Sequence, residues 1–107
     1  MSIHLQTKNH LLQLQRIMQE LDLWQAMPPD EQAFQSTEPF AIDKMAAQEW
    51  LQWIFIPRMH ALIDCEGALP KQIAVSPYIE EALKEHDDLP RLLAPLIEIE
   101  KLLQEQA

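Results

Sequence analysis

The chain has 107 residues, 48% of them hydrophobic, and its 17 acidic and 8 basic side chains give a net charge of −9 at neutral pH. This length fits a single domain, residues 1–107, with a core of its own, and the apolar fraction excludes general disorder. The negative charge argues against direct nucleic-acid binding, whose affinity comes mainly from Lys and Arg. A basic protein is a better match for this surface.

The expected compartment follows from the cysteine count and from hydropathy. Cys65 is the only cysteine, so no disulfide forms within the chain and a reducing environment is the simplest setting. The opening MSIHLQTKNH lacks the basic region and apolar run of a signal peptide. The longest strongly apolar stretch, Trp50 to Pro57, is far shorter than the roughly 20 residues that cross a bilayer. We expect a soluble cytoplasmic protein with no membrane partner.

Helical periodicity is clear from about Ile3 to Trp24, where apolar residues recur on one side at about 100° per residue. We expect this first helix to stop before Pro28-Pro29, which cannot continue it. The connection that follows, Gln25 to Ile42, is long for a compact domain. Three apolar residues are expected to pack this connection against the rest of the domain: Phe34, Phe40 and Ile42.

The second helix is expected over about Lys44 to Asp64, with Asp43 as its N-cap. Its segment EWLQWIFIPRMH, Glu49 to His60, is apolar on nearly every side, as in helices that are buried all round. Pro57 should kink it. Since each helix of a four-helix domain keeps one face toward solvent, something else must cover this one. Two interpretations stay open: the Gln25–Ile42 loop covers that face, or a partner protein does.

Two further helices complete the expected fold. Ser76-Pro77 is typical of an N-cap followed by proline in the first turn, which predicts a third helix over about 77–85. Asp87 or Asp88 is predicted to cap a fourth helix that ends near residue 105. Alternation typical of strands is absent. The pattern predicts an all-α fold, a small four-helix bundle with a long loop between helices 1 and 2.

Composition excludes several kinds of catalytic site. The single glycine, Gly67, rules out a phosphate loop and a dinucleotide fingerprint. No HExxH motif is present, and no glutamate stands three residues before a histidine as in di-iron bundles. The acidic neighbours of Cys65, Asp64 and Glu66, disfavour a reactive thiolate. We therefore expect a protein that is not an enzyme, with no catalytic, cofactor-binding or metal-binding residue.

Two polar clusters have simpler explanations than chemistry. The acidic stretch from Glu80 to Asp88 is better explained as a solvated helix end with a cap than as a metal site. In the second cluster, His60 and Asp64 are four residues apart, so they can share a hydrogen bond beside Arg58. A structural contact or the rim of an interface explains this cluster better than acid–base catalysis.

The central stretch resembles a known family. FQSTEPF at Phe34 to Phe40, EWLQWIFIPRMH at Glu49 to His60, the Leu69-Pro70 pair and AVSPY at Ala74 to Tyr78 are similar in order and spacing to the YqcC-like family. These are small bacterial proteins of uncharacterised function. The resemblance covers roughly half of the chain.

This resemblance implies a helical bundle and no known cofactor or catalytic residue. It also implies a context, because family members are often encoded beside a tRNA pseudouridine synthase and near a flavodoxin. The residues that match the family pattern, together with Phe34, form our candidate interaction surface. They are Phe34, Ser36, Thr37, Trp50, Trp53, Pro57, Arg58 and His60.

Three hypotheses remain at the level of sequence. The first is a non-catalytic accessory module that docks on a protein partner such as a tRNA pseudouridine synthase and does not itself bind nucleic acid. The second is a helical bundle that binds a small molecule near Trp50, Trp53 and Phe34. The third is a structural homodimer that buries the surplus apolar face of the second helix.

Overall fold

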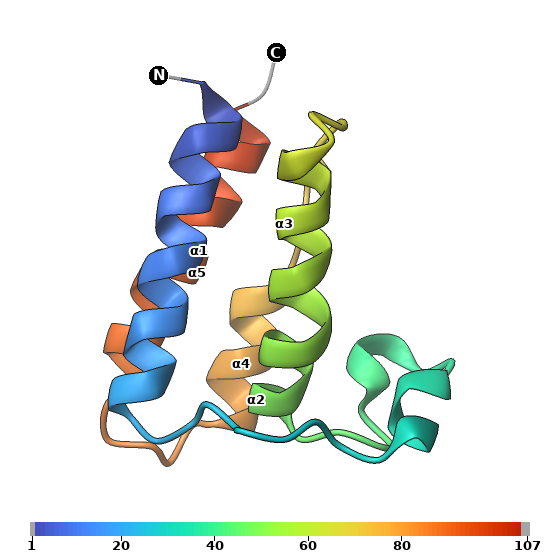
Figure 1. Ribbon diagram of the computed structural model, residues 1–107. Helices are drawn as coiled ribbons and strands as arrows, with labels where there is room; N and C mark the ends of the chain where they lie inside the picture. The colour runs from blue at the N-terminus through green and yellow to red at the C-terminus, as the bar shows by residue number, and fades with distance from the viewer. Residues whose placement is uncertain (1, 106–107) are drawn as a thin grey trace.

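The computed structural model describes residues 2–105, and that part of the chain contains helices and no strand. The chain passes along the bundle four times in alternating directions, so residues 2 and 105 lie at the same end (Figure 1). The predicted all-α four-helix bundle is confirmed. In chain order the elements are α1 (Ile3–Glu20), the 3₁₀ turns η1 (Glu31–Gln35) and η2 (Pro39–Ala41), α2 (Ala47–Trp50), the π-helical η3 (Leu51–Phe55), α3 (Ile56–Asp64), α4 (Val75–Ala82) and α5 (Leu89–Gln104).

The core lies where α1 and α5 face each other and the second helix closes over them. α1 packs most extensively against α5, while α3 contacts α1 and α4 contacts both α2 and α5. The apolar stripes expected from periodicity supply this core, since their residues are buried. The most buried apolar side chains are Leu11, Leu14, Met18, Leu51, Ile79, Leu92, Leu96, Ile99 and Leu103.

The second helix is continuous from Ala47 to Asp64 but changes its hydrogen-bond register before Pro57. Because Pro57 has no N–H, the carbonyl of Trp53 loses its usual partner four residues on. The backbone responds with a π turn in which the N–H of Ile56 donates to the carbonyl of Leu51. The expected disturbance at Pro57 is therefore a locally widened helix, η3, rather than a break.

The predicted end of the first helix was wrong. α1 stops at Glu20, four residues before Trp24, and Asp22 takes the left-handed conformation with φ of 59°. The N–H of Leu23 then donates to the carbonyl of Met18 at 2.8 Å, closing the helix end. Asp tolerates this conformation because its short polar side chain can bond locally.

The predicted cap of the second helix was also wrong. The helix begins at Ala47, and the carboxylate of Glu49 accepts the N–H of Ala46 at 2.8 Å. Asp43 lies upstream of this start and accepts the hydroxyl of Ser36 at 2.5 Å, which holds the loop together.

The third helix begins one residue before the expected Ser76 cap. α4 starts at Val75, and its free amides are satisfied from α5 by the carboxylate of Glu100. One oxygen of Glu100 accepts the N–H groups of Val75 and Ser76, both at 2.9 Å, and the other accepts the Ser76 hydroxyl at 2.5 Å. Glu100 is buried, so this cap also ties α4 to α5.

The unequal lengths of the last two helices shape one face of the molecule. α4 has 8 residues and α5 has 16, so α4 covers only part of the bundle's length. An extended segment, residues 68–74, takes its place beside α3 and passes behind that helix in Figure 1. Without a helix there, the wall of α3 is only partly covered: Leu62 remains half-buried.

Replacing Thr7 by valine is expected to raise the free energy of unfolding by about 1 kcal/mol. The Thr7 hydroxyl is fully buried in α1 and has no hydrogen-bond partner among the described residues. Valine keeps the shape and removes the unpaired polar atom. Urea unfolding followed by circular dichroism measures the change. The exposed Thr37→Val serves as the control and should change stability by less than about 0.5 kcal/mol; equal effects of the two variants would contradict the prediction.

Candidate functional site

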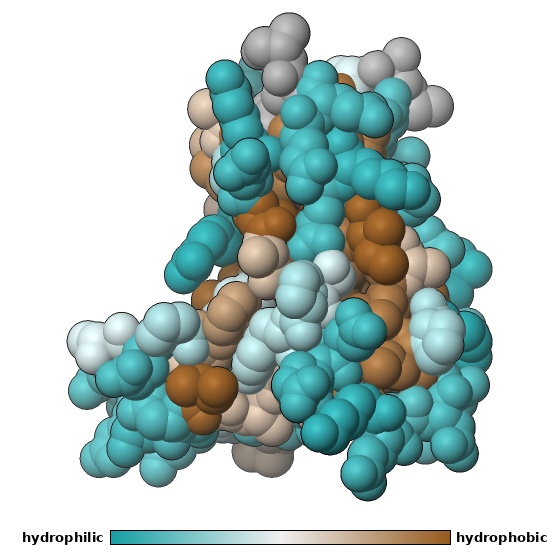
Figure 2. All heavy atoms as spheres, turned by 180° about the vertical axis from the view of Figure 1, so that it is seen from behind, coloured by the Kyte–Doolittle hydropathy of each residue, from teal (hydrophilic) through white to brown (hydrophobic). Residues whose placement is uncertain are grey.

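An apolar groove runs along α3. Its volume is about 660 Å³, and its walls come from η2, the second helix and the extended segment before α4. Figure 2, seen from behind, shows apolar side chains reaching the surface on that side of the molecule between polar ones. The groove exists because α4 is short, so the segment in its place lies against α3 with small side chains such as Ala68 and Ala74.

A cluster of four aromatic rings adjoins the groove, and three of them, Phe40, Trp50 and Phe55, line it. Phe40 from η2 stacks on Tyr78 of α4 with ring centroids 4.2 Å apart, and its edge meets Trp50 at 4.9 Å. Trp50 in turn stacks against Phe55 at 5.5 Å. Contacts of this kind contribute about 0.5–1.5 kcal/mol each beyond the burial of their area. The cluster joins the long loop, the second helix and α4.

Phe40 reaches this cluster through an unusual backbone. Phe40 and Ala41 both lie in the left-handed region, with φ of 59° and 49°. Residues other than glycine pay about 1–3 kcal/mol for such a conformation and keep it only when surrounding contacts compensate. The stacking on Tyr78 and Trp50 provides these contacts. Removal of those rings should therefore let the η2 turn relax.

Burial raises the pKa of the Tyr78 hydroxyl above its usual value of 10.0. The folded protein thus holds this proton more tightly than the unfolded chain. Stability from this group is complete below pH about 10 and falls as the pH rises through the folded pKa, because the unfolded chain ionises first. Tyr78 is the only tyrosine, so phenolate absorbance reports it alone. We expect a higher titration midpoint in buffer than in concentrated urea; identical midpoints would contradict this.

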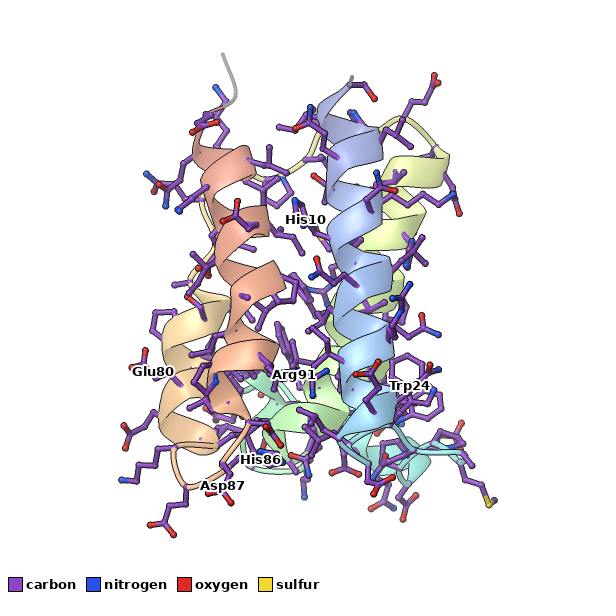
Figure 3. The ribbon with its side chains drawn as sticks, turned by 90° about the vertical axis from the view of Figure 1, so that its left-hand side faces the viewer. His10, Trp24, Glu80, His86, Asp87 and Arg91 are labelled. Atoms are coloured by element: carbon purple, nitrogen blue, oxygen red, sulfur yellow. The ribbon has the colours of Figure 1, made fainter. Side chains whose placement is uncertain are left out.

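Arg58 stands at the rim of the groove and is the only charged side chain that lines it within residues 2–105. It is exposed, and none of the hydrogen bonds or ion pairs of the described chain includes it. Arg91, by contrast, is paired with Glu20 across α1 and α5, where Figure 3 shows its position. The guanidinium of Arg58 is therefore available to an outside group.

The side of the second helix away from the groove is covered by the start of the long loop. The side-chain amide of Gln52 donates to the carbonyl of Gln25 and accepts its N–H, both at 2.7 Å. The indole N–H of Trp53 donates to the Gln25 side chain at 3.0 Å. These bonds explain how Gln52 is buried without cost. The loop thus covers η3, while the α3 wall of the groove stays open.

The structure brings together only part of the predicted interaction surface. Trp50 and Arg58 meet at the groove. Ser36 and Thr37 lie apart from it, around a polar depression of about 340 Å³ in the long loop. The other members are also outside the groove: Phe34 is exposed on η1, Trp53 is held by Gln25, Pro57 is exposed, and His60 is half-buried.

Several groove residues were not identified from the sequence. Leu62 and Ile73 had no signal of their own, because their place in the groove depends on which helix neighbours them. Phe40 was expected to pack against the body, which it does, but its left-handed backbone has no local sequence signature such as glycine.

The polar clusters show no arrangement suited to a metal. Within residues 2–105 no three His, Cys, Asp or Glu side chains converge as a metal site requires. Figure 3 shows Glu80 projecting from α4 while His86 and Asp87 lie in the turn beyond it. The N–H of Asp88 donates to the ring of His86 at 3.1 Å, so this histidine helps to shape the turn. No hydrogen bond joins His60 to Asp64 in the described chain.

None of the helices described between residues 2 and 105 is long and apolar enough to cross a membrane. Cys65 is exposed and carries a free thiol.

Comparison with known proteins gives two similar relatives that match most of this chain and most of their own length, and one of them has a solved structure. An uncharacterised protein of Haemophilus influenzae is 62% identical over 97 residues, which are 91% of this chain and 92% of that protein. The uncharacterised protein YqcC of Escherichia coli is 41% identical over 102 residues, 95% of this chain and 92% of that one. The solution NMR structure of YqcC from E. coli has a TM-score of 0.88 and 38% identity, covering 100% of this chain and 92% of that chain.

A further relative is much longer than this chain. A protein of Pectobacterium carotovorum named tRNA pseudouridine synthase C is 52% identical over 71 residues, which are 66% of this chain and 19% of that protein. A family model described as DUF446, tRNA pseudouridine synthase C, matches residues 6–102. The resemblance to YqcC-like proteins is thereby confirmed, and the chain belongs to the DUF446 family.

Proposed function

We propose that this protein is a non-catalytic accessory module that docks on a tRNA pseudouridine synthase in the cytoplasm. The observation that carries the proposal is the Pectobacterium relative, in which a segment 52% identical to this chain makes up 19% of a protein named tRNA pseudouridine synthase C. A module that is part of such a polypeptide in one protein can meet the same partner as a separate chain in another.

The charge of the chain supports docking on protein rather than on tRNA. With a net charge of −9 the surface repels phosphates, whereas a basic RNA-binding enzyme attracts it and meets it faster. The residues also supply little for catalysis. Cys65 lies between two acidic residues, and the described chain gathers no cluster of metal-ligating side chains.

The test is direct titration of the purified chain with the tRNA pseudouridine synthase C of the same organism by calorimetry. We expect one-to-one binding with a Kd below about 10 µM, and no binding of the chain alone to tRNA at about 0.1 M salt. A pseudouridine synthase of another family is the control and should release no heat. Absence of binding to synthase C at about 100 µM of both proteins would overturn the proposal.

A small-molecule-binding bundle is the second candidate, and the volume of the groove favours it. About 660 Å³ falls within the range of about 300–1,000 Å³ that is typical of ligand pockets. A ligand there would touch Trp50 and change its fluorescence. Titration against a metabolite panel separates the two candidates, since only this one predicts saturable changes without the synthase. Light scattering of the isolated chain decides the homodimer hypothesis.

A further inference from the structure

Among residues 2–105, the groove combines an apolar interior with one cation, Arg58, that has no ion-pair partner, and this combination defines the chemistry of its occupant. Trp50, Phe55 and Met59 form a buried floor, and half-buried Leu62 and Ile73 form facing walls. Arg58 lies one turn before Leu62 on α3, so the two side chains stand on the same face about 5–6 Å apart at their Cβ atoms. An occupant therefore meets apolar surface and a positive charge within one helical turn.

We propose that the groove binds an apolar side chain of the partner protein and that Arg58 pairs with a carboxylate next to that side chain. The proposal rests on the proposed docking function and names the contact. The partner would present a Leu, Phe or Trp anchor with an Asp or Glu within one turn of it. Such an arrangement uses the planar fork of arginine, which binds both oxygens of a carboxylate.

Net charge favours a carboxylate carried on a protein over a free organic acid. A free anion must approach a chain of net charge −9, and one arginine offsets little of that repulsion. A basic protein is attracted as a whole and can still present one acidic side chain at the contact. Arg58 has no ion-pair partner within residues 2–105. On binding, it gains one in a site from which the partner's apolar side chain has expelled water.

A matched set of four variants tests this contact. Arg58→Glu reverses the charge at the groove, and Ala68→Phe fills the groove from an exposed position on its other wall. The controls make the same two changes in a separate depression between α1 and α5: Arg16→Glu and Ala94→Phe. Arg16 is also exposed and has no ion pair in the described chain, so the change in net charge is the same. Circular dichroism confirms that each variant is folded.

We expect both groove variants to weaken binding to synthase C by at least about tenfold and both controls to stay within about twofold. If the wild-type chain binds and all four variants bind equally well, the groove proposal fails while the docking function stands. Equal weakening by Arg58→Glu and Arg16→Glu would show that the loss is not specific to the groove and would also overturn it. If the wild-type chain does not bind, the docking function itself has failed.

A parallel titration with dodecanoate tests the free-acid alternative. The proposal predicts no saturable change in tryptophan fluorescence at concentrations up to about 100 µM, because the whole chain repels the free anion. Saturable binding of dodecanoate that Arg58→Glu abolishes, together with unchanged synthase affinity of both groove variants, would assign the groove to a free carboxylate and overturn the proposal.

Discussion

Replacing Glu100 by alanine is expected to lower the free energy of unfolding by about 3 kcal/mol, because it leaves three donors at the start of α4 without an acceptor. Glu100 is buried and accepts the N–H groups of Val75 and Ser76 and the Ser76 hydroxyl. Each buried donor left unpaired costs about 1–3 kcal/mol, of which local rearrangement recovers part. Urea unfolding monitored by circular dichroism gives the value.

Controls on the same helix isolate the cap. Glu98→Ala removes an exposed carboxylate that forms only a surface ion pair with Lys101, and it should change stability by less than about 0.5 kcal/mol. Ser76→Ala should cost little once Glu100 is already alanine, since the two side chains act as a unit. A loss from Glu100→Ala no larger than that from Glu98→Ala would mean that α4 does not depend on this cap.

Replacing Trp50 by alanine is expected to destabilise the fold by about 3–4 kcal/mol, the usual cost of removing a buried aromatic side chain. Trp50 is 8% exposed and contacts the rings of Phe40, Phe55 and Tyr78. Its loss also removes part of the support for the left-handed backbone at Phe40. Thermal and urea unfolding measure the effect.

The comparison for Trp50 is Phe34, another aromatic residue of the predicted interaction surface. Phe34 is 43% exposed on η1 and makes no ring contact in the described chain. Phe34→Ala should therefore cost less than about 1 kcal/mol, and Trp50→Phe should fall between the two alanine variants. Similar losses for Trp50→Ala and Phe34→Ala would contradict the central place of Trp50 in the cluster.

The helices could be predicted because their signals are local. The apolar stripe of α1, with Leu11, Leu14 and Met18, repeats at the helical period, and the same period marks Leu92 and Leu96 in α5. Prolines and polar loops separate these stripes clearly. Four helices and a long first connection follow from such signals without knowledge of the tertiary structure.

The caps of the second helix and of α4 could not be predicted, whereas Asp88 does stand at the N-cap position of α5, without a side-chain capping bond. Ser76 has the local signature of an N-cap, but the carboxylate that satisfies the start of α4 comes from Glu100 on another helix. Likewise, the start of the second helix is set by Glu49, while Asp43 bonds to Ser36 in the loop. The free amides at a helix start can be satisfied by any acceptor that tertiary packing brings to them, so the residue just before the helix need not be the cap.

The groove was predictable only in its central helix. Trp50 and Arg58 were named because they match the pattern of the YqcC-like family, and the apolar circumference of the second helix indicated that this helix needs a cover. The positions of Leu62, Ile73 and Ala68 in the groove could not be predicted, because they depend on the length of α4 and on the path of the segment before it. The length of α4 depends on how the helices pack. The sequence therefore predicted that another segment must cover α3, but it did not predict the shape of the groove.

The most direct measurement is residue-level NMR of the ¹⁵N-labelled chain during titration with unlabelled tRNA pseudouridine synthase C. The proposed docking predicts that the amide signals of Arg58, Leu62 and Ile73 shift or broaden at substoichiometric synthase. Those of Arg16 and Ala94, in the depression between α1 and α5, should stay in place. Changes confined to that depression, or an unchanged spectrum with excess synthase, would contradict docking through the groove.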